Sequence, residues 1–299
     1  MAVPHFLNRA TAAISTVLLG KDYPVRLALS CLLAGGHLLL EDLPGTGKTT
    51  LAEALARCFG LQFHRLHFTS DLLPADLTGV EVLDPATGQF RFQPGPLFCQ
   101  VLLADEINRA SPRTQSALLE AMANGRVSVD RTSHNLPQPF VVIASQNGLD
   151  QSGTSPLPES QLDRFLMRLS LGFPDRTAEA AILNGQQATL DQINTGLTPE
   201  HLIQARQALQ QQPVSPALIN YVLDLVHGSR EQGPGLGPRA SQGLLRAAKA
   251  WALLEGATTV TPDHVQAVFY AVAEHRLDGG HRRAVPLSQA LLERVDALR

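Results

Sequence analysis

The segment 42–49 combines glycines, a lysine and a threonine in a pattern that can bind phosphate. It reads DLPGTGKT, follows an apolar run at 37–41 and precedes a helical pattern. Glycines allow the backbone amides of residues 45–49 to turn around phosphate oxygens, and the helix N-terminus adds partial positive charge. Lys48 would then reach the β- and γ-phosphates, and the Thr49 hydroxyl would bind Mg²⁺. The segment therefore predicts a nucleotide-binding loop.

This loop departs from the usual pattern at one position. The pattern GxxxxGK[ST] begins with glycine, whereas this chain has Asp42 there. The part expected to surround the phosphates is intact. The predicted nucleotide-binding residues are Pro44, Gly45, Thr46, Gly47, Lys48, Thr49 and Thr50. We therefore expect nucleotide binding, and Asp42 is the one position at which the loop departs from the usual pattern.

Two adjacent carboxylates end a second apolar run. Residues 101–104 read VLLA and are followed by Asp105 and Glu106. Carboxylates at the end of a buried strand are costly to desolvate without a partner, and a metal-bound nucleotide would supply one. Asp105 is predicted to hold Mg²⁺ through water, and Glu106 to polarise the attacking water.

Three further polar residues are candidates for positioning water or neutralising charge at the γ-phosphate. Asn147 follows the apolar run at 140–144 and would position water together with Glu106. Arg164 and Arg239 each precede a regular pattern, and an arginine offered to a γ-phosphate neutralises charge that develops during transfer. On residue type alone, a surface ion pair is the simpler interpretation of each arginine.

The elements that must position these residues alternate between strands and helices. Continuous apolar runs at 37–41, 101–104 and 140–144 favour strands buried on both faces, as in a parallel sheet covered by helices. Helical patterns at 48–58 and 114–122 lie between them. This alternation predicts an α/β sandwich.

Two hairpins and a helical region complete the predicted architecture. Turn-rich residues predict hairpins at about 80–92 and 126–136, both inserted into the sandwich. From about residue 174 the pattern is helical alone, with proline-initiated helices. We expect an α/β domain at 1–174 and a smaller all-α lid domain at 175–299.

Composition excludes several classes of protein. With 44% hydrophobic and 17% charged residues, the 299-residue chain can bury a sizeable core and is neither disordered nor fibrous. A net charge of −3 and three lysines argue against a surface that wraps nucleic acid. The three cysteines lack CxxC spacing and fit reduced thiols in the cytoplasm. We find no signal peptide and no apolar stretch long enough to span a bilayer. His64 and His67 are three residues apart, so on a strand they would not share a metal ion.

Together these motifs resemble those of AAA+ ATPases and, within that superfamily, the MoxR group. The resemblance covers nearly the whole chain. It is carried by AGGHLLLEDLPGTGKTTLA (34–52), LLPADLTG (72–79), FQPGPLF (92–98), ADEINRASPRTQSALLEAM (104–122), VIASQN (142–147), LPESQLDRF (157–165) and GPRASQGLLRAAKAWALLEG (237–256). It implies an AAA+ P-loop NTPase fold: an α/β/α sandwich with a parallel sheet and two inserted β-hairpins, followed by a helical lid.

The resemblance also implies a role for each candidate residue. The roles map to Walker A at 44–49, Walker B at Asp105 and Glu106, sensor 1 at Asn147 and sensor 2 at Arg239. The arginine finger maps to Arg164, with Arg168 four residues further on as the alternative.

The implied activity is Mg²⁺-dependent ATP hydrolysis by a cytoplasmic, homo-oligomeric ring, usually a hexamer. Family members act as chaperone-like factors beside proteins that carry von Willebrand A domains. We expect ATP between the sandwich and the lid of one subunit, with Arg164 of the neighbour completing the site. Three alternatives stay open: a magnesium-chelatase-type motor subunit, a nucleic-acid translocase and a non-hydrolysing scaffold. The acidic balance argues against the translocase, and the intact Asp105, Glu106 and Asn147 argue against the scaffold.

Overall fold

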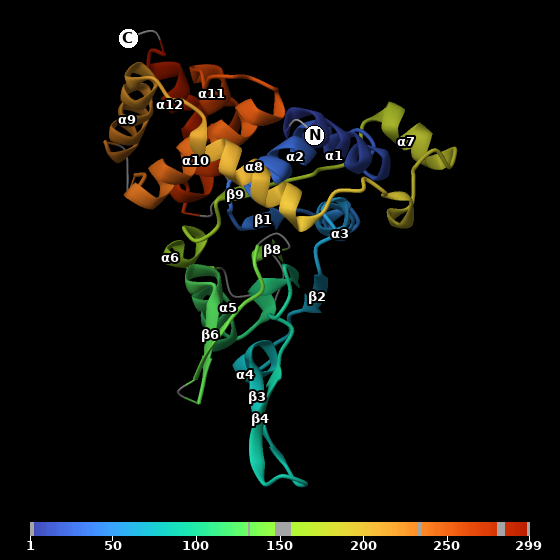
Figure 1. Cartoon of the computed structure of the whole chain (residues 1–299). Coiled ribbons are helices and arrows are strands. Elements are labelled where there is room, and N and C mark those ends of the chain that lie inside the picture. The colour runs from blue at the N-terminus through green and yellow to red at the C-terminus, as the bar shows by residue number, and fades with distance from the viewer. Residues whose placement is uncertain (1–2, 131, 147–156, 232–234, 280–284, 298–299) are drawn as a thin grey trace.

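A parallel sheet lies at the centre of the molecule (Figure 1). The computed structural model describes residues 3–130, 132–146, 157–231, 235–279 and 285–297. The sheet has five strands in the order β2-β5-β8-β1-β9. The strands are β1 (Leu38–Glu41), β2 (Phe63–His67), β5 (Val101–Asp105), β8 (Val141–Gln146) and β9 (Met167–Leu169). The predicted parallel α/β sheet is confirmed.

Successive residues of the inner strands face two different apolar cores. In β1, Leu38 and Leu40 belong to one buried cluster and Leu39 belongs to the other. Strands β5 and β8 alternate in the same way. Because both faces are covered, successive positions up to the carboxyl ends of these strands are apolar, and this explains why the strands read as continuous apolar runs.

Helices that precede residue 163 cover both faces of the sheet. The first cluster packs under α1 (Val3–Val17), α2 (Asp22–Leu33) and α3 (Lys48–Cys58). The second packs under α4 (Pro74–Thr78), the short helix η1 (Ile107–Arg109), α5 (Pro112–Asn124) and α6 (Glu159–Leu162). Helix α5 begins where Ser111 accepts a hydrogen bond from the Thr114 amide, and it ends at left-handed Gly125.

The remainder of the chain is helical, as predicted. Its elements are α7 (Arg176–Leu183), η2 (Leu190–Gln192), α8 (Pro199–Gln211), α9 (Pro216–Arg230), α10 (Pro238–Leu254), α11 (Pro262–Leu277) and α12 (Leu287–Arg294). Helices α8 to α11 begin with proline at the first helical position, where its missing N–H would have no partner anyway. Within the described ranges, no helix has the length and apolarity needed to cross a bilayer.

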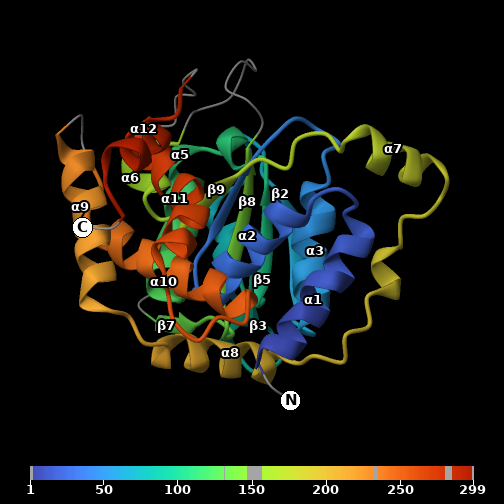
Figure 2. The same ribbon diagram turned by 90° about the horizontal axis from the view of Figure 1, so that it is seen from above.

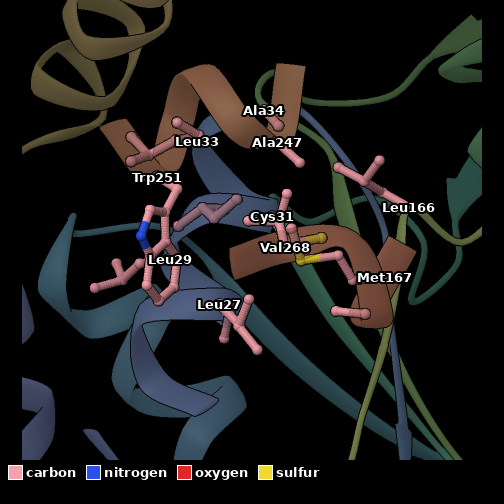
Figure 3. Packing of buried hydrophobic residues seen from close by; sticks show 14 of the residues in the cluster. Leu27, Leu29, Cys31, Leu33, Ala34, Leu166, Met167, Ala247, Trp251 and Val268 are labelled. Atoms are coloured by element: carbon pink, nitrogen blue, oxygen red, sulfur yellow. The ribbon is translucent and has the colours of Figure 1, made fainter. Parts of the chain in front are cut away.

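The lid helices share one apolar core with α2. Figure 3 shows Trp251 of α10 and Val268 of α11 beside Leu29 and Cys31 of α2. Seen from above (Figure 2), α9 to α12 lie on one side of the strands and α1 and α3 on the other. This packing fixes the position of α10 relative to the sheet. The division of the chain at residue 174 stays a prediction.

Both predicted hairpins are present. One is formed by β3 (Gly79–Asp84) and β4 (Gln89–Pro94), and the other by β6 (Arg126–Val129) and β7 (Thr132–Asn135). The β3–β4 hairpin projects away from the sheet (Figure 1). Phe92 stacks on the His134 ring at a centroid distance of 3.8 Å. The two insertions therefore contact each other.

Candidate nucleotide site

The loop after β1 turns at two glycines in the left-handed region. Gly45 has φ 82° and Gly47 has φ 99°, a conformation that a side chain would strain. Helix α3 begins directly afterwards at Lys48. The unpaired amides of its first turn and the positive end of its dipole therefore lie at the loop. This arrangement suits a phosphate.

A cavity of about 430 Å³ joins this loop to the carboxyl end of β5. Its lining, called here the P-loop cavity, consists of Pro44, Gly45, Gly47, Lys48, Thr49, Thr50, Arg65, His67, Asp105 and Glu106. The fold thus brings together two predicted motifs that lie far apart in the sequence. Of the predicted loop residues, Thr46 is buried outside the lining, and its hydroxyl donates to the Leu43 carbonyl at 3.2 Å.

Lys48 places a cation between the loop and the two carboxylates. Its Nζ donates to the carbonyl oxygens of Asp42 at 2.7 Å and Leu43 at 2.9 Å. Burial lowers the pKa of Lys48, and the nearby carboxylates of Asp105 and Glu106 oppose that effect. A phosphate oxygen can replace these carbonyls as the acceptor and is a stronger partner because it is charged.

Asp105 is held by two donors from neighbouring strands. The Ser145 hydroxyl of β8 donates to Oδ1 at 2.5 Å, and Arg65 of β2 donates to Oδ2 at 2.6 Å. Burial alone would raise the pKa of Asp105, but the hydrogen bonds from Ser145 and Arg65 outweigh it and leave the pKa lowered. The carboxylate is therefore ionised, as a metal ligand must be.

Glu106 adopts a left-handed backbone conformation with φ 57°, which is uncommon for a residue other than glycine. Its amide donates to the Ser145 hydroxyl at 2.9 Å. Its Oε2 lies 2.8 Å from Nε of Arg109 and 3.4 Å from Nε2 of His67. Ser145 thus orients both acids, and the two carboxylates have separate cationic neighbours.

The residues present fit a nucleotide with Mg²⁺. The Thr49 hydroxyl and the Asp105 carboxylate are hard oxygen donors of the kind that Mg²⁺ prefers. Across the described ranges, no group of three His, Cys, Asp or Glu side chains could hold a metal by itself. Phosphate oxygens and water would have to complete the coordination, which is the usual Mg²⁺ arrangement in such sites.

Asp42, the departure from the usual pattern, has partners of its own. Its Oδ2 accepts hydrogen bonds from the amides of Leu171 and, at 2.9 Å, Gly172. Lys21 donates to the Gly172 carbonyl at 3.0 Å, and burial lowers its pKa against the opposing charges of Asp42 and Asp175. Asp42 therefore ties the start of the loop to the segment that follows β9.

Arg164 and Arg239 lie at a second cavity, of about 180 Å³. Its lining, called here the arginine pocket, consists of Gly35, Gly36, His37, Met122, Ala123, Asp163, Arg164, Leu166, Arg239, Arg246 and Arg276. Gly36 and His37 precede the amino end of β1, whereas the P-loop follows its carboxyl end. A four-residue strand spans about 13 Å, at about 3.3 Å per residue.

This position corrects one expectation. Arg239 does not line the P-loop cavity, so the site is not closed by the lid of the same chain in the way expected from the sequence. Figure 1 shows the physical reason: α6 and α10 lie to the left of the central strands and α3 to the right. The packing of α10 against α2, and of α11 against β9, carries the arginine away from its own P-loop.

Asp163 connects the arginines of this pocket. Its Oδ1 lies 2.8 Å from Nε of Arg276, and its Oδ2 lies 3.8 Å from Nη1 of Arg239. The adjacent Arg164 donates to the Leu119 carbonyl at 3.1 Å. The two arginines that the sequence singled out therefore line the same pocket as this carboxylate, and Arg239 is the one that contacts it.

Arg168 has a different environment from Arg164. Its side chain is 8% exposed, lies 2.6 Å from Asp278 of the lid and 3.7 Å from Glu41 of β1. Glu41 also accepts from the Gln146 side chain at 3.0 Å. Arg168 is thus part of a buried ion-pair network beside the start of the P-loop. Asn147 lies outside the described residues.

Comparisons with known proteins agree with these motifs. Residues 37–167 match the model of the ATPase family associated with various cellular activities (AAA), and residues 233–295 match that of the AAA lid domain. YeaC of Bacillus subtilis is 41% identical over 91% of this chain and 86% of its own length. The chaperone MoxR1 of Mycobacterium tuberculosis is 36% identical over 91% of this chain and 76% of its own.

A solved structure is similar along the same length. The crystal structure of a candidate ATPase from Cytophaga hutchinsonii has a TM-score of 0.85 and 30% identity, covering 98% of this chain and 96% of that one. The similarity therefore includes the sandwich, the hairpins and the lid together. On this sequence and structural similarity, the chain is an ATPase that belongs to the MoxR family of the AAA+ superfamily.

Proposed function

We propose that this chain hydrolyses ATP with Mg²⁺ in a ring whose catalytic sites form between neighbouring copies, and that the ring remodels a client protein. The observation that carries the proposal is the separation of the two cavities. Lys48 and the acids line one, whereas Arg164 and Arg239 line the other. In a head-to-tail ring, the arginine pocket of one copy faces the P-loop cavity of the next.

The P-loop cavity binds and orients the substrate. The amides of residues 45–49 and the Lys48 ammonium hold the phosphates. Thr49 and Asp105 would hold Mg²⁺, which when bound neutralises phosphate charge. The Glu106 carboxylate orients and polarises the attacking water, and Ser145 keeps that carboxylate in place through the Glu106 amide. Asn147 assists with the same water.

The neighbouring copy supplies positive charge. Arg164 and Arg239 approach the terminal phosphate from outside the P-loop cavity and stabilise the charge that develops as the bond breaks. Asp163 sets their spacing because it contacts Arg239 and is adjacent in sequence to Arg164. This assignment places the lid arginine at the same nucleotide as the arginine finger.

The client is a protein, contacted by the β3–β4 hairpin. MoxR1 is named a chaperone, which supports a remodelling role. Val80, Val82, Leu83 and Phe90 of the hairpin are exposed, and Phe90 is 70% exposed. Apolar side chains on a projecting element suit transient contact with apolar segments of another protein. A von Willebrand A domain protein is the auxiliary partner that the family resemblance implies, and six subunits is the ring size it implies.

The first experiment measures ATP hydrolysis per subunit against protein concentration, with Mg²⁺, alongside particle mass at each concentration. We expect specific activity to rise steeply as rings form and then to level off. Glu106→Gln is expected to bind ATP and to hydrolyse it at least about 10²-fold more slowly, since a positioned base contributes about that much. Full specific activity in a monomer would overturn the intersubunit site.

A further inference from the structure

The arginine pocket carries more positive charge than the described chain neutralises. Four guanidinium groups line it, from Arg164, Arg239, Arg246 and Arg276, and among its lining residues Asp163 provides one carboxylate. His37 adds no charge near neutral pH because burial lowers its pKa to about 4. A concave site with this excess favours an anionic ligand.

The four arginines are not equally engaged. Arg276 is 6% exposed and bonds Asp163 and the Phe165 carbonyl at 2.7 Å. Arg239 shares Asp163, and Arg164 donates to a backbone carbonyl. Arg246 is exposed and, within the described ranges, makes no hydrogen bond or ion pair. Its guanidinium therefore keeps its full donor capacity for a ligand.

The spacing along α10 puts Arg246 on the same side as Arg239. Residues 239, 243 and 246 are four and three apart, so they share one helix face. Gly243 sits between the two arginines and packs tightly on Leu166, where an added Cβ would lie 2.8 Å from a methyl group. A Cβ on Gly36 would meet the same leucine at 2.3 Å. These contacts hold the arginine face of α10 against the amino end of β1.

We propose that Arg246 binds the terminal phosphates of the nucleotide held by the neighbouring copy, together with Arg164 and Arg239. The inference rests on the proposed intersubunit site and extends it by a residue about two turns after Arg239 on the same face of α10. A planar guanidinium pairs with two phosphate oxygens at once, which a neutral residue cannot do.

The decisive experiment mixes two inactive variants. Lys48→Ala removes nucleotide binding but retains Arg246, whereas Arg246→Ala retains the P-loop. If Arg246 acts on the neighbour's nucleotide, an equal mixture regains roughly a quarter of wild-type activity, because one interface in four pairs an intact P-loop with an intact arginine. No recovery would mean that Arg246 does not act across the interface. Wild-type activity of Arg246→Ala alone would also overturn the proposal.

A second readout does not depend on hydrolysis. In a Glu106→Gln background, ATP-dependent ring assembly is followed by sedimentation velocity. Arg246→Ala is expected to raise the concentration for half-assembly with ATP about tenfold or more, as for loss of a hydrogen bond to a charged group, and to leave nucleotide-free association unchanged. Arg246→Lys is expected to recover part of the effect. If Arg246→Ala and its parent assemble equally, phosphate binding by Arg246 is contradicted. The positive charge at this position would then have no role in nucleotide binding.

Two controls separate this inference from the proposed function. Lys249→Ala removes a charge from the same helix outside the arginine pocket and is expected to match its parent in both assays. Arg164→Ala mixed with Lys48→Ala tests the intersubunit site itself. If the mixture with Arg164→Ala regains ATPase activity and the mixture with Arg246→Ala does not, the role of Arg246 is overturned and the intersubunit site stands. If neither mixture regains activity, both the intersubunit site and the role of Arg246 are overturned.

Discussion

The P-loop cavity and the arginine pocket differ in how they satisfy their charges. In the P-loop cavity, Lys48 is close enough to both acids to feel their charge, and each acid has a cationic neighbour of its own. In the arginine pocket, the Asp163 carboxylate contacts two of the four arginines, and Arg246 has no partner within the described ranges. The first cavity is electrostatically balanced without a ligand, and the second is not.

This difference indicates what each cavity requires. A balanced site with free amides can bind a nucleotide within one chain. The excess positive charge of the arginine pocket is neutralised only when an anion binds. In the proposed function, that anion is the nucleotide held by another copy. Variants of the two cavities should therefore separate nucleotide affinity from turnover.

The largest effect is expected for the finger arginine. Arg164→Ala should lower turnover by about 10³-fold or more, because an arginine finger contributes about 10³–10⁵. Its affinity for ATP, measured at concentrations too low for ring assembly, should stay unchanged, since Arg164 does not line the P-loop cavity of its own chain. Phosphate release and binding of a fluorescent ATP analogue measure the two quantities. Turnover within tenfold of wild type would remove Arg164 from the site.

Arg168 should behave in the opposite way. Arg168→Ala leaves buried Asp278 and Glu41 without their guanidinium, and breaking a buried pair costs about 3–5 kcal/mol of unfolding free energy. Urea unfolding measures this loss. Arg164→Ala is the matched comparison and should lose far less. Equal losses in the two variants would contradict the distinction between a buried and an accessible arginine.

His37 should make the stability of the protein depend on pH. Its Nδ1 accepts from the Val142 amide at 2.9 Å and its Nε2 donates to the Met122 carbonyl at 3.1 Å, so the neutral ring is the bonded form. Burial lowers the pKa of His37 in the folded protein to about 4, below the ordinary histidine value of about 6.5. As pH falls between these values the unfolded chain binds the proton first, so up to about 3 kcal/mol of stability is lost.

The control for this prediction is His37→Gln, which keeps one donor and one acceptor but does not titrate. Unfolding free energies of both proteins are measured from pH 7 to pH 4. The wild type should lose more stability than the variant on acidification. Parallel curves would show that His37 does not contribute to the pH dependence.

The smallest effect is expected for Asp42. Asp42→Gly restores the usual loop residue but removes the acceptor for the Leu171 and Gly172 amides, so ATP affinity should fall about tenfold, equivalent to about 1.4 kcal/mol. Asp42→Asn keeps an oxygen acceptor and should retain most of the affinity. Hydrogen exchange at these two amides reports the contact directly. Unchanged exchange in Asp42→Gly would remove the coupling between the loop and the segment after β9.

The elements predicted from the sequence were those with strong local signals. Strands β1, β5 and β8 are buried on both faces, and their continuous apolar runs indicate this burial. Strand β2 is at the sheet edge and mixes half-buried with exposed positions, so periodicity did not identify it as a core strand. Strand β9 has three residues, too few for a pattern.

The same contrast holds for the site. Four functional neighbours were missed: Arg65, His67, Arg109 and Ser145. Two weak signals were available. Arg65 and His67 are two apart and so share one face of a strand, and Ser145 interrupts an apolar run. Neither signal indicates a partner without the sheet order that puts β2 and β8 on either side of β5.

The phosphate-binding loop, the acid pair and the alternation of strands and helices could be predicted from the amino-acid sequence alone. These depend on backbone conformation and on burial at neighbouring positions, which are local properties. The position of Arg239, in the pocket of Arg164 rather than at its own P-loop, and the burial of Arg168 became evident from the folded structure. Those outcomes depend on how α10 and α11 pack against α2 and β9, through contacts between residues more than a hundred positions apart.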